Sequence, residues 1–202
     1  MKALLIVDLQ YDFLPGGALA VPGGDEIIPL ANDLQSRFPL VVATQDWHPE
    51  GHKSFASAHI GRKPFDTIRL NDMPQILWPD HCVQGSRGAA LSDALSQHRI
   101  EAIFRKGTES EIDSYSAFYD NGRKKTTGLE HYLKGKGVTD LFVCGLAGDF
   151  CVAWSVADAL EAGLRTTVIE DATRAISDQG YQKEKQRLLS MGAMFVTSSD
   201  IL

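Results

Sequence analysis

Short apolar runs alternate along this chain with longer stretches in which apolar residues recur at helical spacing. Six of the runs have the length and the β-branched or apolar composition of strands: residues 3–7, 40–44, 100–105, 141–145, 166–169 and 194–197. Most are continuously apolar, which is typical of strands covered on both faces. Their alternation with helices predicts βαβ units around a parallel sheet.

Four segments between these runs carry helical periodicity. Residues 24–38 form the first, with Pro29 near the start, where proline is tolerated. The sequence Thr127-Gly128-Leu129-Glu130 has the form of a capping box and would begin a short second helix. Residues 149–162 and 178–191 form the last two, each followed by a glycine that can end a helix.

Composition narrows the class of protein. The chain has 202 residues, of which 44% are hydrophobic, so we expect one domain over residues 1–202. The 20 Lys and Arg against 26 Asp and Glu give a net charge of -6, which argues against nucleic acid or an anionic membrane as a partner. The apolar run at residues 3–7 is too short for a signal peptide or a membrane span. Three scattered cysteines form no disulfide framework, so we expect a cytoplasmic protein.

Two segments, residues 47–88 and 108–126, fit no regular element, and loops of this length usually cover a functional site. The first holds His48, His52, His59 and His81, four of the six histidines in the chain. Asp46 and His48 stand two residues apart and would project to the same side of an extended chain. Imidazole with carboxylate suits zinc, iron or manganese, although chance clustering in a loop explains the same pattern.

Reactive side chains stand at the ends of successive predicted strands. Asp8, Asp46, Lys106 and Cys151 occupy these positions. The carboxyl ends of parallel strands meet at one edge of a doubly wound sheet, so we expect the four to converge there. Each alone is equally consistent with a turn carboxylate, a solvated strand end or a packing cysteine. At a helix N-terminus and near Lys106, the Cys151 thiol is expected to have a lowered pKa.

The other two cysteines point less clearly to chemistry. Cys144 lies in the middle of a predicted strand and is expected to pack in the core. Cys82, beside His81, is consistent with loop packing or with the wall of a site. A redox pair that includes Cys151 lacks the support of a CxxC motif.

The chain resembles the nicotinamidases, cysteine hydrolases of the isochorismatase-like superfamily, along nearly its whole length. The resemblance rests on seven segments in order: Ile6-Val7-Asp8-Leu9-Gln10 with Asp12-Phe13, Gln45-Asp46-Trp47-His48-Pro49, Ser54-Phe55, Trp78-Pro79-Asp80-His81-Cys82-Val83, Arg105-Lys106-Gly107, Asp113-Ser114-Tyr115-Ser116-Ala117-Phe118, and Gly145-Leu146-Ala147 through Cys151-Val152. It implies an α/β fold with three α/β/α layers and a doubly wound sheet of six mainly parallel strands in the order 3-2-1-4-5-6.

The resemblance also implies roles for individual residues. These are a catalytic triad of Asp8, Lys106 and Cys151, and a divalent metal, zinc first and iron or manganese next, on Asp46, His48 and His81. His52 is a candidate fourth ligand or a residue behind the ligands. Further implied roles are an oxyanion hole from the N–H groups of Ala147 and Cys151 with a cis peptide at Leu146-Ala147, and a substrate-binding wall from Phe13, Trp78 and Tyr115.

The implied reaction is hydrolysis of nicotinamide to nicotinate and ammonia through a cysteine thioester, within NAD salvage. Pyrazinamide would be a further substrate, and the hydrolytic water would be activated by Asp8 or by the metal. Two alternatives remain: a cysteine hydrolase of another amide or ureide, and a non-catalytic ligand- or metal-binding module. The Asp46-x-His48 motif with His81 argues against the first, and the intact triad against the second. A homo-oligomer would be ordinary, but no apolar stripe identifies an interface.

Overall fold

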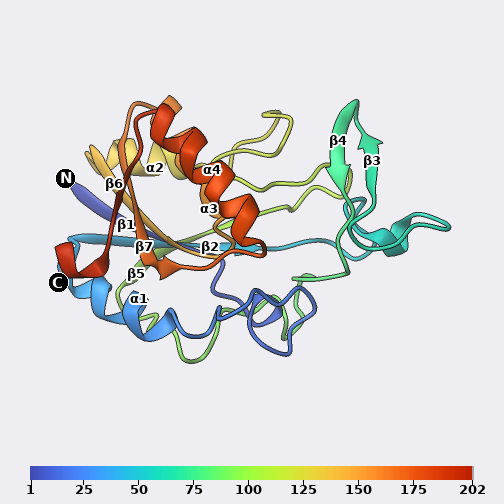
Figure 1. The fold of residues 1–202 in the computed structure, drawn as a ribbon, viewed down its shortest axis with the longest axis horizontal. Coiled ribbons are helices and arrows are strands. Elements are labelled where there is room, and N and C mark those ends of the chain that lie inside the picture. Colours follow the sequence, from blue (N-terminus) through green and yellow to red (C-terminus); the bar gives the residue numbers. More distant parts are fainter. Residues whose placement is uncertain (202) are drawn as a thin grey trace.

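A computed structural model describes residues 1–201 and contains a six-stranded sheet in which all neighbours run parallel (Figure 1). Its strands are β1 (Lys2–Val7), β2 (Leu40–Asp46), β5 (Ile100–Lys106), β6 (Asp140–Gly145), β7 (Arg165–Thr173) and β8 (Met194–Val196). Their order is β5-β2-β1-β6-β7-β8. Numbered within this sheet alone, the order is 3-2-1-4-5-6, as expected, and all six predicted strands are present.

Helices cover both faces of the sheet, giving three layers (Figure 1). On one face lies α1 (Ile28–Leu34), and on the other lie α2 (Leu129–Gly135), α3 (Cys151–Glu161) and α4 (Asp178–Ser190). Short 3-10 turns complete the regular structure at Tyr11–Phe13, Gln35–Arg37, Ala56–Ala58 and Ser198–Asp200. Among the described residues, no helix is long and apolar enough to cross a membrane.

The central strand β1 separates two apolar cores. Residues 3–7 are all completely buried. Leu4 and Ile6 pack into the core beneath α1, whereas Ala3, Leu5 and Val7 pack into the core beneath α2 and α3. Because successive side chains of a strand point to opposite faces, a continuously apolar run is what a doubly covered strand requires.

Three helix starts differ from the prediction. The first helix begins at Ile28, four residues later than predicted. The second helix begins at Leu129 after Gly128, whose φ is +90°, and its N-cap makes no side-chain hydrogen bond. The capping box is therefore wrong: Thr127 donates to the carbonyl oxygen of Ala117 at 2.6 Å, and Glu130 pairs with Lys134. The third helix begins at Cys151, two residues later than predicted.

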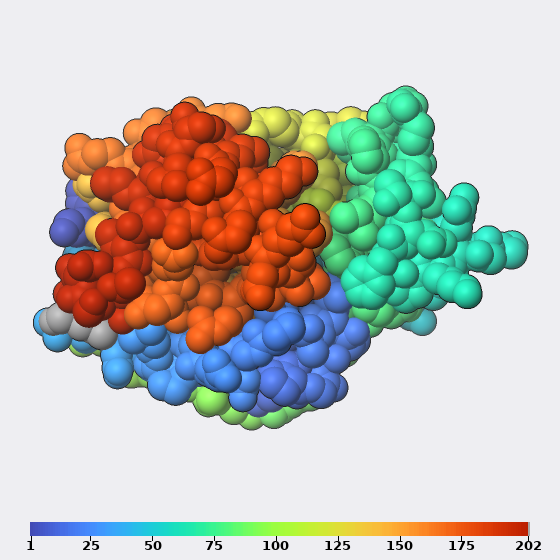
Figure 2. All heavy atoms as spheres, in the orientation of Figure 1, coloured from blue at the N-terminus to red at the C-terminus, as the bar shows by residue number. Residues whose placement is uncertain are grey.

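The long segment between β2 and β5 contains a hairpin that the hydrophobic pattern did not predict. Strands β3 (Thr67–Leu70) and β4 (Met73–Ile76) pair antiparallel around Asn71 and Asp72, which have φ values of +50° and +64°. Two successive left-handed residues are the signature of a type I′ turn, and asparagine and aspartate tolerate this conformation well. The hairpin and the loop before it project from the main body (teal in Figures 1 and 2).

Candidate active site and metal site

Lys106, the last residue of β5, is the centre of a buried polar cluster. Its Nζ atom lies 2.9 Å from Asp8 Oδ2, 3.1 Å from Asp46 Oδ1 and 3.4 Å from Cys151 Sγ. It also donates a hydrogen bond to the carbonyl oxygen of Ser114 at 3.0 Å. Burial lowers the pKa of Lys106, but the charges of Asp46 and Asp8 outweigh burial and hold that pKa well above its usual range. Lys106 is therefore a fixed cation between a thiol and two carboxylates.

Asp8 follows directly after β1 and is completely buried. Its Oδ1 accepts a hydrogen bond of 2.6 Å from Thr44 Oγ1, while Oδ2 faces the ammonium of Lys106. Burial raises the pKa of Asp8, and the Lys106 charge and the Thr44 hydrogen bond offset this rise only in part. A raised pKa suits a carboxylate that must accept a proton and later return it.

Cys151 is the first residue of α3 and lies beside the pocket described below. Burial raises the pKa of its thiol well above the usual value, and Lys106 lowers it only in part. The expected lowered thiol pKa is therefore wrong, because the sequence does not show how far the sulfur is removed from water. The resting sulfur is a neutral thiol, which needs a base before it can attack.

The turn before Cys151 supplies two backbone donors. The peptide bond between Leu146 and Ala147 is cis, as the resemblance implied. Among the hydrogen bonds of residues 1–201, neither the Ala147 N–H nor the Cys151 N–H donates to a protein acceptor. Both residues line the same pocket, so both N–H groups are free for an oxygen of a bound molecule.

Asp46, His48 and His81 form a compact group of metal-ligand type. One ligand atom from each lies within 4.8 Å of the others, and all three residues are buried. Asp46 Oδ2 is 3.0 Å from His48 Nε2 and 3.5 Å from His81 Nε2. The other ring nitrogens bond backbone carbonyls, His48 Nδ1 at Gly107 and His81 Nδ1 at Pro79. A carbonyl accepts a hydrogen bond, so each Nδ1 carries a proton, and each Nε2, which faces Asp46, is the nitrogen at which a divalent metal would take the place of a proton.

The two neighbours of Asp46 hold it as an anion. Burial raises the pKa of Asp46, but His48 and Lys106 outweigh burial and hold that pKa well below its usual range. Gln10 fixes the Asp46 backbone, because its side chain donates to the Asp46 carbonyl oxygen at 2.8 Å and accepts from the Asp46 N–H at 2.7 Å. Asp46 thus presents a permanently charged oxygen to the two imidazoles.

His52 does not join this group. Its Nδ1 accepts from the backbone N–H of Ser54 at 3.1 Å, and its Nε2 lies 3.2 Å from the carbonyl oxygen of Ile112. Both ring nitrogens are therefore engaged away from Asp46. The ring of His52 packs 4.4 Å from the ring of His48, which places it behind a ligand.

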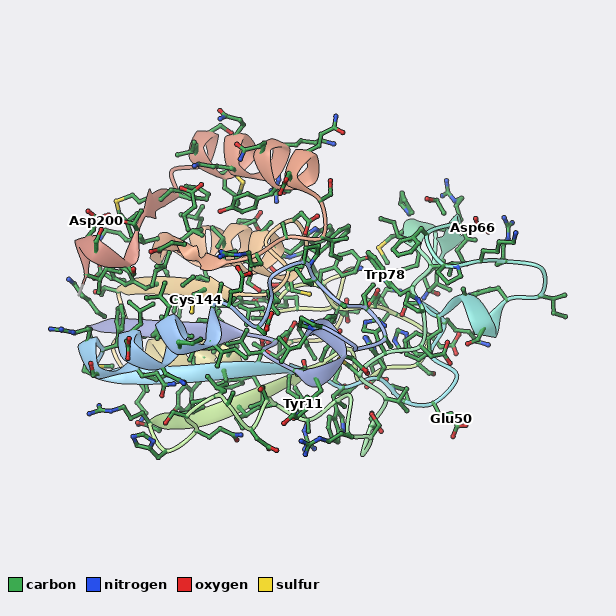
Figure 3. All side chains as sticks on the ribbon, turned by 60° about the horizontal axis from the view of Figure 1, so that its bottom comes forward. Tyr11, Glu50, Asp66, Trp78, Cys144 and Asp200 are labelled. Carbon is green, nitrogen blue, oxygen red and sulfur yellow. The ribbon has the colours of Figure 1, made fainter. Side chains whose placement is uncertain are left out.

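A small aromatic pocket opens beside the sulfur. Its walls include Phe13, Trp78 and Tyr115 together with Phe150 and Ile176. Trp78 lies where the hairpin segment joins the main body (Figure 3). The Trp78 and Tyr115 rings meet edge to face, with centroids 6.2 Å apart. Asp46 and His81 line this pocket together with Cys151 and Ala147, so a molecule bound in it would contact both groups.

Sequence reasoning missed residues that support these groups. Gly107 has a φ of +66°, and a Cβ atom there would collide with the His48 ring and crowd Asp46, so only glycine fits. Gln75, in the unpredicted hairpin, donates to Asp113 Oδ2 at 2.9 Å and to Tyr115 Oη at 3.2 Å. A glycine directly after a strand was the available signal for Gly107, whereas no local pattern indicates that Gln75 reaches the pocket.

The remaining cysteines are structural. Cys144 lies in β6 and is completely buried, and burial raises its pKa to about 12. Cys82 is also completely buried and packs in the core beneath α1. Of the two interpretations of its sequence position, packing is therefore the one that the structure supports.

Comparison with known proteins identifies the family. The isochorismatase domain matches residues 2–200. A nicotinamidase of Acinetobacter baylyi is 50% identical over 201 residues, covering 99% of this chain and 94% of that protein. A nicotinamidase of Escherichia coli is 50% identical over 205 residues, covering 98% of this chain and 96% of that protein.

Solved structures agree with this assignment. An Acinetobacter baumanii nicotinamidase and pyrazinamidase superimposes with a TM-score of 0.97 and 44% identity, covering 100% of this chain and 98% of that one. A Pyrococcus horikoshii pyrazinamidase, solved in complex with zinc, gives a TM-score of 0.81 and 36% identity, covering 97% and 98% of the two chains. The chain belongs to the isochorismatase family and, within it, to the nicotinamidases.

Proposed function

We propose that this nicotinamidase hydrolyses nicotinamide to nicotinate and ammonia through a thioester on Cys151. The observation that carries the proposal is the Lys106 cluster, in which one ammonium lies 2.9 Å from Asp8 and 3.4 Å from the Cys151 sulfur. The proposed nucleophile, base and orienting cation thus lie together beside a pocket lined by aromatic rings.

Acylation begins with transfer of the thiol proton to Asp8. The thiolate of Cys151 attacks the carboxamide carbon, and the carbonyl oxygen becomes an oxyanion. The N–H groups of Ala147 and Cys151 donate to that oxyanion, and each donor of this kind typically contributes about 10²–10³ in rate. Asp8 then protonates the amide nitrogen, the C–N bond breaks, and ammonia leaves a thioester on Cys151.

Deacylation uses the same groups in reverse. Asp8, again a carboxylate, takes a proton from a water molecule that attacks the thioester carbon. The C–S bond breaks, the proton returns from Asp8 to the sulfur, and the product leaves as nicotinic acid, which ionises to nicotinate in water. Lys106 stays an ammonium throughout, because its pKa is far above neutrality, and it stabilises whichever of Asp8 and Cys151 is charged.

The pocket walls and a metal orient the substrate. We propose that the pyridine ring packs between Phe13 and Trp78, with Tyr115 beside it, since all three line the pocket. We propose zinc on Asp46, His48 and His81, with iron or manganese as substitutes that the same donor set accepts. When bound, the metal supplies a Lewis acid for the ring nitrogen, which fixes the carboxamide relative to the sulfur.

The proposal extends to the cellular role. Pyrazinamide, which has the same carboxamide on a ring of the same size, is expected to be a second substrate. Nicotinate production places the reaction in NAD salvage. Cys82, Cys144 and Cys151 are all free thiols, which supports the cytoplasm as the compartment of the enzyme.

Ammonia release from nicotinamide, measured as prepared, after chelation and after return of zinc, iron or manganese, tests activity and metal together. We expect chelation to abolish release and one metal to restore it. Cys151→Ala should bind nicotinamide without releasing ammonia, and turnover by this variant would exclude the thioester. Benzamide, which lacks the ring nitrogen, should react far more slowly, and equal rates would remove the proposed role of the metal.

A further inference from the structure

The turn that carries the two proposed oxyanion donors also contains a buried carboxylate that the proposed reaction does not use. Asp149 stands midway between Ala147 and Cys151 in the sequence and is only 6% exposed. Burial raises the pKa of Asp149, and hydrogen bonds from the backbone N–H groups of Ile176 and Ser177 offset this rise only in part. A polar group this far from water is costly unless its hydrogen bonds are made, so the two bonds are strongly maintained.

Both oxygens of Asp149 bond the segment that connects β7 to α4 (Figure 1). Oδ1 accepts from the Ile176 N–H at 3.0 Å, and Oδ2 accepts from the Ser177 N–H at 2.9 Å. Because the two donors are successive backbone groups, they fix both the position and the orientation of the carboxylate. Ile176 also lines the pocket, so Asp149 ties the donor turn to a wall of the pocket.

Backbone hydrogen bonds hold the other end of the turn against the same segment. The Gly148 N–H donates to the carbonyl oxygen of Arg174 at 2.7 Å, and the Arg174 N–H donates to the carbonyl oxygen of Gly145 at 3.3 Å. These two bonds join main-chain groups and do not depend on a side chain. The two bonds of Asp149 lie nearest in sequence to Cys151, and they do depend on one side chain.

We infer that Asp149 is a positioning residue for the oxyanion hole, whose carboxylate fixes the turn so that the N–H groups of Ala147 and Cys151 converge on one oxygen. This inference deepens the proposed function and rests on it. A donor stabilises an oxyanion fully only if it is already directed at the place where the charge develops, and a misplacement of about 1 Å can cost about 100-fold in rate. Loss of Asp149 should therefore weaken the tetrahedral state and leave binding of the planar amide nearly unchanged.

The first test is Asp149→Asn, which keeps the size of the side chain but replaces one acceptor oxygen by an NH₂ group that cannot accept from a backbone N–H. With the metal-loaded enzyme, kcat for nicotinamide should fall by about 10- to 100-fold and KM should stay within about 3-fold. Asp149→Ala removes both acceptors and should lose at least as much. A raised KM at unchanged kcat would overturn the inference, because Asp149 would then hold only the pocket wall.

Pyridine-3-carbaldehyde gives a readout that does not depend on turnover. The thiol proton of Cys151 passes to Asp8, the sulfur bonds the aldehyde carbon, and an electron pair of the C=O bond moves to the oxygen. The adduct is tetrahedral and needs the oxyanion donors, so Asp149→Asn should raise its inhibition constant by about 10- to 100-fold. The Kd of nicotinamide, measured by calorimetry in Cys151→Ala with and without Asp149→Asn, should change by less than about 3-fold. Equal weakening of both ligands would contradict the inference.

Ser177→Ala is the matched control for loss of stability. It removes the hydroxyl that accepts from the Gly180 N–H at 3.2 Å and caps α4, but it leaves the Ser177 N–H that bonds Asp149. The thermal midpoint of unfolding should fall, while kcat and aldehyde inhibition stay within about 2-fold. Losses of kcat that follow the midpoint equally in Ser177→Ala and Asp149→Asn would mean that Asp149 acts only through stability, which would overturn the inference.

The parent enzyme separates this inference from the function on which it rests. A metal-loaded parent that releases no ammonia from nicotinamide would overturn the proposed function, and the role of Asp149 with it. An active parent together with unchanged kcat and aldehyde inhibition in Asp149→Asn would overturn the role of Asp149 alone.

Discussion

Asp8 and Asp46 are two buried carboxylates that share one lysine and yet differ in the direction of their pKa shifts. Their nearest oxygens lie 2.9 and 3.1 Å from Lys106 Nζ. Burial raises the pKa of Asp8 and prevails there, whereas at Asp46 burial is outweighed by His48 and Lys106, so that pKa falls well below its usual range.

The remaining neighbours explain the difference. Asp8 Oδ1 has one neutral donor, the Thr44 hydroxyl, whereas Asp46 Oδ2 faces the Nε2 atoms of two histidines. One lysine charge is not enough to offset complete burial at Asp8. At Asp46 the lysine is joined by a protonated His48, because burial lowers the His48 pKa but the Asp46 charge outweighs burial and raises it. The same residue type is thereby suited to two tasks, proton transfer at Asp8 and cation binding at Asp46.

The strongest test of this difference compares two variants, Asp8→Asn and Asp46→Asn. Asp8→Asn should reduce kcat by about 10²–10⁴-fold, the usual contribution of a general acid–base group, while the protein still binds one metal ion. Asp46→Asn should lose the metal. Metal content by mass spectrometry and ammonia release by a coupled assay separate the two effects. Near-normal kcat in Asp8→Asn would show that another group takes the thiol proton.

His81→Asn tests the proposed metal site alone. The variant removes one of two Nε2 atoms that face Asp46, so metal affinity should fall by more than about 100-fold, the upper range for changes behind the ligands. Competition with a chelating dye measures the affinity directly. The matched control is His52→Asn, because the nitrogens of His52 point away from Asp46 and its loss should cost much less. Equal losses in the two variants would make His52 a ligand.

The sequence predicts the features of this site that follow from backbone geometry, but not those that depend on distant contacts. The strands were predictable because each is a short apolar run, and Asp8, Lys106 and Cys151 could be brought together because parallel strands end at one edge of a sheet. The pair Asp46 and His48 follows from the alternation of side chains along an extended chain. These are consequences of backbone geometry, which local sequence largely determines.

The features that the sequence did not predict depend on distant contacts. The Cys151 pKa depends on burial by several segments, and the directions of the His52 nitrogens depend on Ser54 and on the remote Ile112. The β3–β4 hairpin has only a short Asn71-Asp72 turn signal and no alternating hydrophobic pattern. Gln75, which holds Tyr115 from that hairpin, was therefore not predictable.

Gln10→Met tests whether fixing the backbone of Asp46 contributes to metal binding. Methionine keeps the length of the side chain but removes the bonds that fix the Asp46 N–H and carbonyl. Metal affinity should fall by about 10-fold, as for other residues that orient a ligand, with little effect on metal-saturated kcat. Titration with zinc followed by assay at saturation tests both expectations. A kcat that stays low at saturating zinc would place Gln10 in the acid–base machinery.

Thr44→Val tests the Asp8 side of the comparison with Asp46 and should have the smallest effect on activity. Only the carboxylate form of Asp8 can take the thiol proton, so kcat/KM falls as the pH drops through the Asp8 pKa. The Thr44 hydroxyl stabilises that carboxylate, and its removal should raise the pKa and move the acid limb upward by about 1–2 units, because a hydrogen bond to a charged group is worth about 1.5–3 kcal/mol. Above this limb kcat/KM should change only a few-fold.

The pH profile of Gln10→Met is the control for Thr44→Val, since the Gln10 side chain bonds the Asp46 backbone and not the Asp8 carboxylate. An acid limb that moves in Thr44→Val and stays in place in Gln10→Met would assign the titration to Asp8. A limb that moves downward, or that moves equally in both variants, would mean that the limiting protonation lies outside Asp8. The two carboxylates would then differ only in metal binding, and the raised pKa of Asp8 would have no part in catalysis.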